Sequence, residues 1–405
     1  MPGVRTAIII GGGIAGPVTA LALRRAGIEA TVHEAYPAGG GELGGTLTLA
    51  PNGVAALSHV GADEAVVART TPITRQIMTA GDRRVELPAL RGAPPLRVIS
   101  RGDLHRTLGE LTSAAGITVA YEKRMTGVRQ GPAGVTAEFA DGGTATADIL
   151  IGADGVRSIT RRLIDPQAPG PRYTGTLGFE AVASAEVGVE PGTLTFGFGR
   201  GAFYLYWPEP GGGTRWGVNL PWPRSLTVPE ARAVGTARWA GILRDTFAAD
   251  RPGHDLSSTT DPDGLQIAGA MQIMPPVPHW HRGRMVLVGD AAHAPSSTSG
   301  QGASLTVESA VQLARCLRDI ADVPAAFATY ERLRRGRVER IAARAARINQ
   351  AKVPGPLARA LMPVVMPALV KLMSPERTIG PDHRYTIDWA SHAEHRGGGR
   401  GALAE

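Results

Sequence analysis

Residues 7–34 read AIIIGGGIAGPVTALALRRAGIEATVHE, and this stretch decides the fold. Ala7–Ile10 is a short apolar run that predicts a buried strand. It leads directly into Gly11-x-Gly13-x-x-Gly16, and a helix is expected to follow, beginning at Pro17. A second strand then ends on Glu34. Strand, glycine turn, helix and strand with a terminal acid form the pattern of a dinucleotide-binding unit.

Each part of this unit has a physical role. Gly11 permits the tight turn, Gly13 allows the backbone to approach a pyrophosphate, and Gly16 lets helix and strand pack closely. The helix start, including Ile14 and Ala15, offers free N–H groups and a positive dipole end to phosphates. Glu34, followed by Ala35, lies where an acid binds a ribose 2′-hydroxyl. The acid favours FAD or NAD over NADP as the ligand of this unit.

Composition places the chain among globular proteins of two or three structural units. It has 405 residues, of which 43% are hydrophobic and 20% charged. The net charge of +7 raises the possibility of nucleic-acid binding. However, the arginines are dispersed, and the densest group, in residues 332–347, has the spacing of the solvated face of one helix. Attraction for anionic cofactors accounts for the excess charge, and no nucleic-acid partner is expected.

Cysteine and metal-ligand content point to a reducing compartment. Cys316 is the single cysteine, so no internal disulfide can form, and a cytoplasmic location is expected. No cysteine–histidine cluster has zinc spacing, so no metal site is predicted. The N-terminal apolar run belongs to the nucleotide-binding strand rather than to a signal peptide. The apolar stretch 357–373 is interrupted by Arg359, Pro363 and Lys371 and is too short to span a membrane.

The rest of the chain divides into segments that differ in aromatic content and in hydrophobic periodicity. Residues 171–274 hold most of the aromatic side chains in alternating patterns that predict antiparallel strands, and residues 71–97 are expected to join them. Helical periodicity dominates residues 228–249, 303–317 and 325–350. The predicted organisation is a discontinuous nucleotide-binding domain, a substrate-binding sheet domain, a C-terminal helical segment and a disordered tail. The nucleotide-binding domain comprises residues 1–70, 98–170 and 275–352, and the substrate-binding sheet domain comprises residues 71–97 and 171–274. The C-terminal helical segment comprises residues 353–390, and the tail comprises residues 391–405.

Three loops stand out because each follows an apolar strand and joins glycine to a short polar residue. They are Gly11–Gly16, the GADGVRS sequence of Gly152–Ser158, and the VGDAAHAPSSTSGQGAS sequence of Val288–Ser304. Three separate strands that deliver such loops to one place suit a single long cofactor. A second glycine-rich βαβ unit, which a two-dinucleotide reductase would need, is not found in the sequence.

These three motifs, in this order, resemble the fingerprints of the class A flavoprotein monooxygenases, the para-hydroxybenzoate hydroxylase superfamily. The resemblance covers about 300 residues and includes Arg101, in SRGDL, where such enzymes place an arginine near the flavin. It implies an α/β fold in which a Rossmann-type FAD-binding domain is interleaved with an antiparallel-sheet substrate domain, with helices at the C-terminus. It also implies bound FAD and a transient NADPH or NADH reductant.

The resemblance further implies roles for individual residues. Glu34 would bind the adenosine ribose, Arg101 would meet the pyrophosphate, and Asp290 would bind the ribityl chain. The backbone of Gly300–Ser304, including Gly302 and Ala303, would line the isoalloxazine, where N–H groups can face the pyrimidine carbonyls. Asp154 would contact FAD and Arg157 would contact NAD(P)H. The alternative for these last two is a salt bridge that fixes their loop.

The third loop departs from the family pattern. Many members carry a proline two or three residues before Gly-Gln-Gly, whereas Ser297 and Thr298 occupy those positions here and the proline is Pro295. Many members also have asparagine where this chain has Ser304. His293 suggests a general base, but in the resembling family this histidine is mostly part of the loop frame. No catalytic residue is therefore assigned.

The substrate side rests on the strand 202–208, AFYLYWP. Period two places Tyr204 and Tyr206 on one face and Phe203, Leu205 and Trp207 on the other. Tyr204 stands four residues before Pro208, as a substrate-contacting tyrosine does in hydroxybenzoate hydroxylases. Tyr204, Tyr206 and Ser297 are the predicted substrate contacts, and ordinary sheet packing is the alternative for the tyrosines. The expected substrate is a neutral, planar, aromatic small molecule.

The function implied is an FAD-dependent, NAD(P)H-using monooxygenase. Reduced FAD would bind O₂ as a C4a-hydroperoxide in a dry site and transfer one oxygen atom to an aromatic or polycyclic compound. Natural-product biosynthesis and aromatic catabolism are the expected settings. Epoxidation, Baeyer–Villiger oxygenation, or a flavin-binding accessory protein without turnover are the alternatives. The chain is expected to act as a monomer or homodimer, and its apolar stretch 357–373 to cap the pocket rather than touch a membrane.

Overall fold

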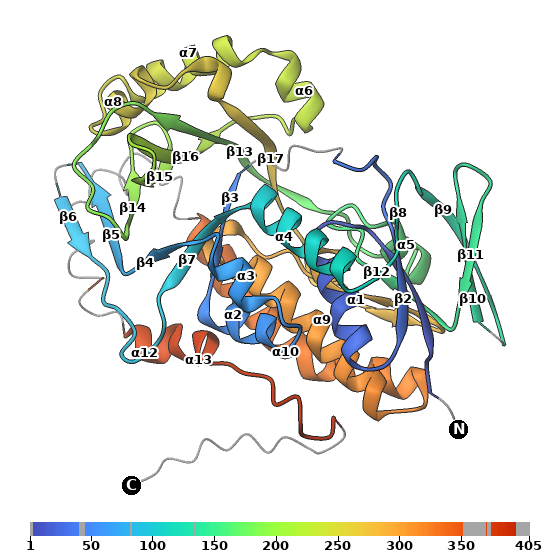
Figure 1. Ribbon diagram of the computed structural model, residues 1–405. Coiled ribbons are helices and arrows are strands. Elements are labelled where there is room, and N and C mark those ends of the chain that lie inside the picture. Colours follow the sequence, from blue (N-terminus) through green and yellow to red (C-terminus); the bar gives the residue numbers. More distant parts are fainter. Residues whose placement is uncertain are drawn as a thin grey trace, which may run out of the picture.

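The computed structural model describes residues 3–39, 45–81, 83–132, 134–350, 370 and 374–393. Two large sheets dominate it (Figure 1). One has six strands and lies among the long helices α9 (Gly302–Asp319) and α10 (Val323–Gln350), and the other has seven strands and carries short helices on its outer side. The expected α/β class, with a Rossmann-type unit interleaved with a second sheet, is confirmed.

The six-stranded sheet has the order β18-β19-β12-β1-β2-β8, with parallel pairing except at β18. Pairing sets Ala7 opposite both Ile149 and Ala30, so three chain segments share one register. The carboxyl ends of these strands therefore lie along one edge of the sheet. The strands are β1 (Thr6–Ile10), β2 (Glu29–His33), β8 (Val119–Ala120), β12 (Ile149–Gly152), β18 (His281–Arg282) and β19 (Met285–Leu287).

Apolar side chains bury both faces of this parallel sheet. Ile8, Ile9 and Leu150 are at most 2% exposed, as expected for strands covered by helices on two sides. Helix α1 (Ala15–Arg25) packs between β2 and α9, and α10 packs along α9. The core cluster here draws on residues 7–66, 99–164 and 274–341, which explains how a discontinuous sequence forms one body.

Two small sheets extend this body. β9 (Met125–Gly131), β10 (Gly134–Phe139) and β11 (Thr144–Ala147) form an antiparallel meander. β7 (Leu96–Ser100) lies between β3 (Thr46–Leu49) and β4 (Thr71–Ile73) and leads into α4 (Arg101–Ala114). Helices α2 (Pro51–Ser58) and α3 (Asp63–Val67) follow β3 in the chain, and α5 (Ile159–Ile164) follows β12.

The seven-stranded sheet has the order β17-β13-β16-β15-β14-β5-β6. Its pairs are antiparallel except β14 with β5, which run parallel, so the predicted purely antiparallel sheet is corrected at this point. The parallel pair arises because β5 comes from the segment that precedes the sheet's other strands. The strands are β5 (Arg75–Ala80), β6 (Arg83–Glu86), β13 (Arg172–Ala183), β14 (Thr193–Phe198), β15 (Phe203–Pro208), β16 (Thr214–Pro221) and β17 (Gln266–Ile273).

Helices α6 (Val228–Ala233), α7 (Thr236–Phe247) and α8 (Gly253–Ser258) cover the outer face of this sheet (Figure 1). The sequence pattern predicts one helix over residues 228–249, but Gly235, with φ of +90°, separates α6 from α7. Trp216, Trp239 and Phe247 are at most 1% exposed and fill the space beneath these helices.

The C-terminal region contains α12 (Pro375–Thr378) and α13 (Gly380–His383). The predicted disordered tail begins too early, because residues 391–393 are packed. Arg315 donates to the carbonyl oxygen of Ser391 at 3.0 Å, and Ala393 is 2% exposed. Most of the proposed cap at 357–373 and the tail from 394 on lie outside the described residues. Within the residues that the structure describes, no helix is long and apolar enough to cross a membrane.

Candidate functional site

The first glycine loop has the geometry that its sequence predicts. Gly11 has φ of +107°, and a Cβ there would meet the carbonyl oxygen of Ala153 at 2.4 Å. A Cβ on Gly16 would lie 1.9 Å from the carbonyl oxygen of Gly11, so only glycine allows this turn. By contrast, a Cβ on Gly13 would meet nothing within 4 Å. Open space in front of Gly13, next to the N-terminus of α1, suits a pyrophosphate.

Glu34 is fixed beside this loop. Its carboxylate accepts from the backbone N–H of Gly12 at 2.6 Å and from that of Tyr36 at 3.0 Å. A residue that sequence reasoning missed, His105 on α4, places its Nε2 3.0 Å from the carbonyl oxygen of Gly12. The two hydrogen bonds to Glu34 hold its carboxylate at the carboxyl end of β2. The contact of His105 fixes α4 against the glycine turn.

Asp290 lies near enough to Arg101 for the two charges to interact. The Asp290 residue is exposed to solvent. Burial raises the pKa of the Asp290 carboxyl, and the charge of Arg101 acts in the opposite direction. The carboxylate accepts no hydrogen bond from any residue that the structure describes. A carboxylate and a guanidinium with unused capacity, beside the open space at Gly13 and Gly302, fit the polar chain of FAD.

Asp154 serves its own loop. Its carboxylate accepts from Ser158 Oγ at 2.5 Å and from the backbone N–H and hydroxyl of Thr160 at 3.0 Å each. Arg157 is exposed and forms no salt bridge with Asp154, so the predicted alternative of such a bridge is wrong. The loop is fixed by helix capping instead. Both carboxylate oxygens of Asp154 already accept hydrogen bonds within the loop. Contact of Asp154 with a cofactor therefore stays a prediction.

Arg161 is the residue that joins the second loop to the third. It is 2% exposed, and its Nη1 donates to the carbonyl oxygen of Ala291 at 2.9 Å. Its Nη2 donates to the carbonyl oxygen of Val156 at 2.8 Å. The sequence shows Arg161 only as part of a basic helix, and nothing local distinguishes it from the exposed Arg162.

The third loop is clamped by the segment that joins β3 to α2. Thr48 donates its hydroxyl proton to the carbonyl oxygen of Gly300 at 3.0 Å, and the backbone N–H of Ala50 donates to Ser304 Oγ at 3.0 Å. A Cβ on Gly53 would lie 2.4 Å from Ser304 Oγ, so the two helices meet without space for a side chain. These contacts fix the first turn of α9 against β3 and α2.

His293 belongs to the frame of this loop rather than to a reacting surface. It is 5% exposed, and its Nε2 lies 2.9 Å from Ser309 Oγ on α9. Burial, together with the charge of Arg334, lowers the pKa of His293 to about 3. The ring is therefore neutral and enclosed at physiological pH, which disfavours the general-base interpretation.

The two predicted substrate tyrosines occupy the helix-covered face of the second sheet. Tyr204 and Tyr206 are 2% and 4% exposed and stack with ring centroids 5.7 Å apart. Tyr204 also meets Phe247 of α7 edge to face at 5.1 Å. Their packing matches the alternative of ordinary sheet aromatics, and this corrects their placement in a substrate pocket. Period two correctly separates the two faces but does not tell which one the helices cover.

The opposite face of the same strand turns towards the third loop. Trp207, with Leu205 beside it, packs against Val98 of β7. Val98 pairs with Thr48, the residue that holds Gly300. An apolar and aromatic sheet face is thus continuous with the loop expected to line a flavin. Ser297 is exposed in the 3₁₀ turn at residues 297–299, next to that loop.

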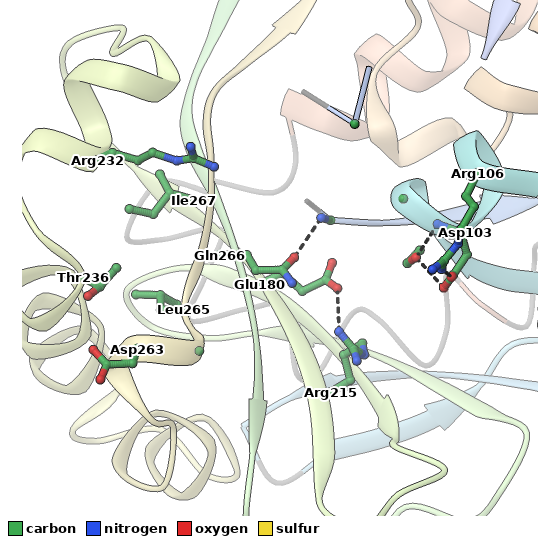
Figure 2. A pocket seen from close by; sticks show the side chains of 15 residues that line it. Asp103, Arg106, Glu180, Arg215, Arg232, Thr236, Asp263, Leu265, Gln266 and Ile267 are labelled. Carbon is green, nitrogen blue, oxygen red and sulfur yellow. Dashed lines mark hydrogen bonds and ion pairs between the residues drawn. The ribbon is translucent and has the colours of Figure 1, made fainter. Parts of the chain in front are cut away.

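A separate cleft of about 920 Å³ opens between the first turn of α4 and the second sheet. Figure 2 shows three arginines on its walls, from α4, β16 and α6. Arg106 is paired with Asp103, and Arg215 with Glu209 and Glu180. Arg232 is exposed and makes no ion pair with a described residue. The cleft adjoins the FAD-type cradle because Ser100 and Gly102 flank Arg101.

Comparison with known proteins matches residues 5–345 to the family described as FAD binding domain. The chain belongs to this family of FAD-dependent aromatic hydroxylases. It is 31% identical over 379 residues to the aurachin C monooxygenase/isomerase of Stigmatella aurantiaca, covering 92% of this chain and 95% of that protein. It is 32% identical to the 3-hydroxybenzoate 6-hydroxylase of Klebsiella oxytoca, covering 84% and 87% of the two chains.

Among solved structures, the HpxO protein of Klebsiella pneumoniae, complexed with FAD and uric acid, superimposes with a TM-score of 0.81. The two are 26% identical, and the match covers 94% of this chain and 96% of that one. Membership of the family of FAD-dependent hydroxylases makes this protein an oxidoreductase that uses FAD.

Proposed function

We propose that this FAD-dependent enzyme is an NAD(P)H-using monooxygenase that acts on an aromatic or polycyclic small molecule. The balanced reaction takes substrate C–H, O₂, NAD(P)H and one proton to substrate C–OH, NAD(P)⁺ and water. Bound FAD would supply the redox chemistry, by accepting hydride and activating O₂. The protein contributes binding, orientation and exclusion of water.

The single observation that carries the proposal is the apolar face of β15 beside the third loop. Trp207 is 3% exposed and packs with Val98 beneath this face, next to the strand that holds Gly300. Leu96, Phe196 and Leu205 are only partly buried on the same face, and a planar aromatic substrate would bury its ring against them. The names of the relatives, among them 3-hydroxybenzoate 6-hydroxylase and FAD-dependent urate hydroxylase, agree with a flat, conjugated substrate.

The residues proposed to hold FAD are those predicted from the sequence. The glycine turn and Glu34 would take the adenosine half, Arg101 and Asp290 the middle, and the start of α9 the isoalloxazine. Support comes from the open space at Gly13 and Gly302 and from the free carboxylate of Asp290. The full set is Gly11, Gly13, Ile14, Ala15, Gly16, Glu34, Ala35, Arg101, Asp154, Asp290, Gly300, Gly302, Ala303 and Ser304.

The reductant would dock in the 920 Å³ cleft, whose size and arginines suit a dinucleotide with phosphate groups. Arg232 lines this cleft and makes no ion pair within the described part of the chain. Glu230 lies on α6, the helix that carries Arg232, and Arg157 is near Glu230. Both arginines therefore border α6. This position keeps Arg157 as a candidate contact for NAD(P)H.

The proposed domains are those expected from the sequence, except that residues 391–393 belong to the packed C-terminal segment and not to the tail. They are supported by two separate core clusters, one of which lies within residues 177–267. We also propose a cytoplasmic location and a monomeric or homodimeric state. The buried, unpaired thiol of Cys316 suits a reducing compartment.

The proposal is tested with the purified holoenzyme. NADPH and NADH are each mixed with the enzyme in air, with and without a panel of phenolic and polycyclic compounds. Reductant oxidation that is stimulated by a compound, with matching hydroxylated product, supports the proposal. Oxidation of neither nicotinamide in the presence of any compound would count against it.

A further inference from the structure

A buried polar chain lies directly behind the third loop. Asn52, on the first turn of α2, donates from Nδ2 to Gln301 Oε1 at 2.8 Å and to Glu308 Oε1 at 2.6 Å. Gln301 Nε2 donates back to Asn52 Oδ1 at 3.3 Å. Asn52 and Gln301 are each 1% exposed, and Glu308 is fully buried. Gln301 is the residue between Gly300 and Gly302, so this chain holds the backbone expected to face the flavin.

Glu308 is in turn held by two arginines of α10. Its carboxylate lies 2.6 Å from Arg334 Nη1 and 2.9 Å from Arg337 Nη2. Arg334 has no exposed surface, and Arg337 has 7%. The two arginines together hold the Glu308 carboxylate in one position. Removal of any one of these partners would leave a buried charge unpaired, which is strongly unfavourable. Asn52 therefore meets a fixed acceptor.

The far end of the chain is Asp382 of α13. Arg337 Nη1 lies 3.1 Å from Asp382 Oδ1, and Arg337 Nη2 donates to the Asp382 carbonyl oxygen at 2.8 Å. The ring of Tyr385 covers the Arg337 guanidinium at 4.1 Å. Asp382 also pairs with the more exposed Arg340 and Arg344. Loss of the Glu308 charge would therefore leave the buried Arg334 without the carboxylate that pairs with it.

We propose that Asn52, held by Glu308, is a positioning residue that orients Gln301 and thereby the N–H groups of residues 302–304 towards the flavin pyrimidine, since the N–H groups of Gly300 and Gln301 already donate to Ser297 and Ser299. Reduced flavin carries negative charge at that end, so these donors stabilise the reduced form. Glu308 lies one turn after Ser304 on α9. Its negative charge repels the negative charge of the reduced flavin and so opposes the same stabilisation. The pair therefore sets the flavin reduction potential, although neither side chain touches the reacting atoms. This inference rests on the proposed placement of FAD.

Two variants separate the parts of the chain. Asn52→Ala removes the contact with Gln301 and releases the donors, so the flavin midpoint potential is expected to become more negative, with an FAD Kd about tenfold higher. Glu308→Gln keeps the shape and removes the charge, so the potential is expected to become more positive. A general loosening of the structure would not shift the potential in opposite directions.

The control is Thr260→Val, which removes a buried hydroxyl that accepts from Trp216 Nε1 at 2.9 Å beneath the outer helices. Its stability should fall while its potential stays that of the wild type. Potentials are measured on the FAD-loaded proteins by dye-coupled reductive titration, which needs neither NAD(P)H nor a substrate. The monooxygenase proposal can therefore fail while this test still gives an answer.

Opposite shifts of the two variants support the proposal. Unchanged potentials, or shifts in the same direction, overturn it. Should Asn52→Ala fail to fold, Gln301→Ala breaks the same contact from the loop side. That variant is expected to show the more negative potential, and a wild-type potential in it would contradict the proposal.

Discussion

The buried guanidinium of Arg161 donates to the carbonyl oxygen of Ala291 at 2.9 Å, and this bond joins two cofactor loops that lie 130 residues apart in the sequence. The loops follow β12 and β19, which are neighbours in the parallel sheet. Strand order brings the loops together, and Arg161 then fixes their separation. The spacing of the FAD cradle thus depends on a side chain that is not itself predicted to bind the cofactor.

Replacement of Arg161 by methionine should lower both stability and FAD affinity. The buried carbonyl oxygen of Ala291 and the partly buried one of Val156 would lose their donor. The expected loss is about 2 kcal/mol in the free energy of unfolding, measured by urea denaturation with excess FAD. The neighbouring Arg162→Met is the matched control, since Arg162 is exposed, and it should stay within about 0.5 kcal/mol of the wild type. Equal losses in the two variants would refute the bridging role.

Asp290→Ala should weaken FAD binding. The carboxylate accepts no hydrogen bond from the part of the chain that the structure describes and feels the charge of Arg101, as expected of a group that receives cofactor hydroxyls. We expect the FAD Kd to rise at least about tenfold, which corresponds to the loss of about 1.4 kcal/mol of binding free energy. The Kd is obtained by fluorescence titration of the apoprotein. Asp245→Ala, an exposed position on α7, is the control, and an Asp290 variant with unchanged Kd would remove this residue from the cofactor site.

Arg232→Ala should raise the KM for NAD(P)H and leave the rate at saturating reductant nearly unchanged. Arg232 lines the cleft and has no ion-pair partner among the described residues, so its loss removes ground-state attraction for phosphate rather than a contact made only in the transition state. The exposed Arg244 of α7 lies outside the cleft lining, and Arg244→Ala serves as the control. An unchanged KM in Arg232→Ala would place the reductant elsewhere.

The neutral His293 should make the protein sensitive to acid. Its folded-state pKa is about 3, whereas the unfolded value is near 6.5. Below pH 6.5 the unfolded chain therefore binds a proton that the folded chain does not, and stability falls by about 1.4 kcal/mol per pH unit until pH approaches 3. Between pH 7 and pH 5 this single group costs about 2 kcal/mol.

His293→Asn removes that titration. The difference in unfolding free energy between pH 7 and pH 5, measured by urea denaturation in excess FAD, should be about 2 kcal/mol smaller in the variant than in the wild type. Identical pH dependence in the two proteins would show that His293 is protonated in the folded state.

Local sequence patterns predict the fold and the cradle well because each cofactor loop is a strand followed at once by its glycine. Gly11, Gly16 and the strand that ends at Gly152 require only short-range information. Arg161 and Asn52 could not be found in this way. Their partners, Ala291 and Gln301, lie 130 and 249 residues away, and neither position has a distinctive local pattern.

The substrate face shows a different limit of sequence reasoning. Alternation along β15 separates Tyr204 and Tyr206 from Leu205 and Trp207, but both faces are apolar. The choice between them depends on where α7 packs, and Phe247 of that helix settles it by its contact with Tyr204. Tertiary packing therefore decides which aromatic side chains can meet a substrate.

We propose that this enzyme inserts one atom of O₂ into an aromatic compound at the expense of NAD(P)H. Turnover of the holoenzyme under ¹⁸O₂, with the compound that most stimulates NAD(P)H oxidation, is followed by mass spectrometry of the product. One ¹⁸O atom is expected in each product molecule. Flavin that no nicotinamide reduces, or product oxygen that comes from water, would contradict it.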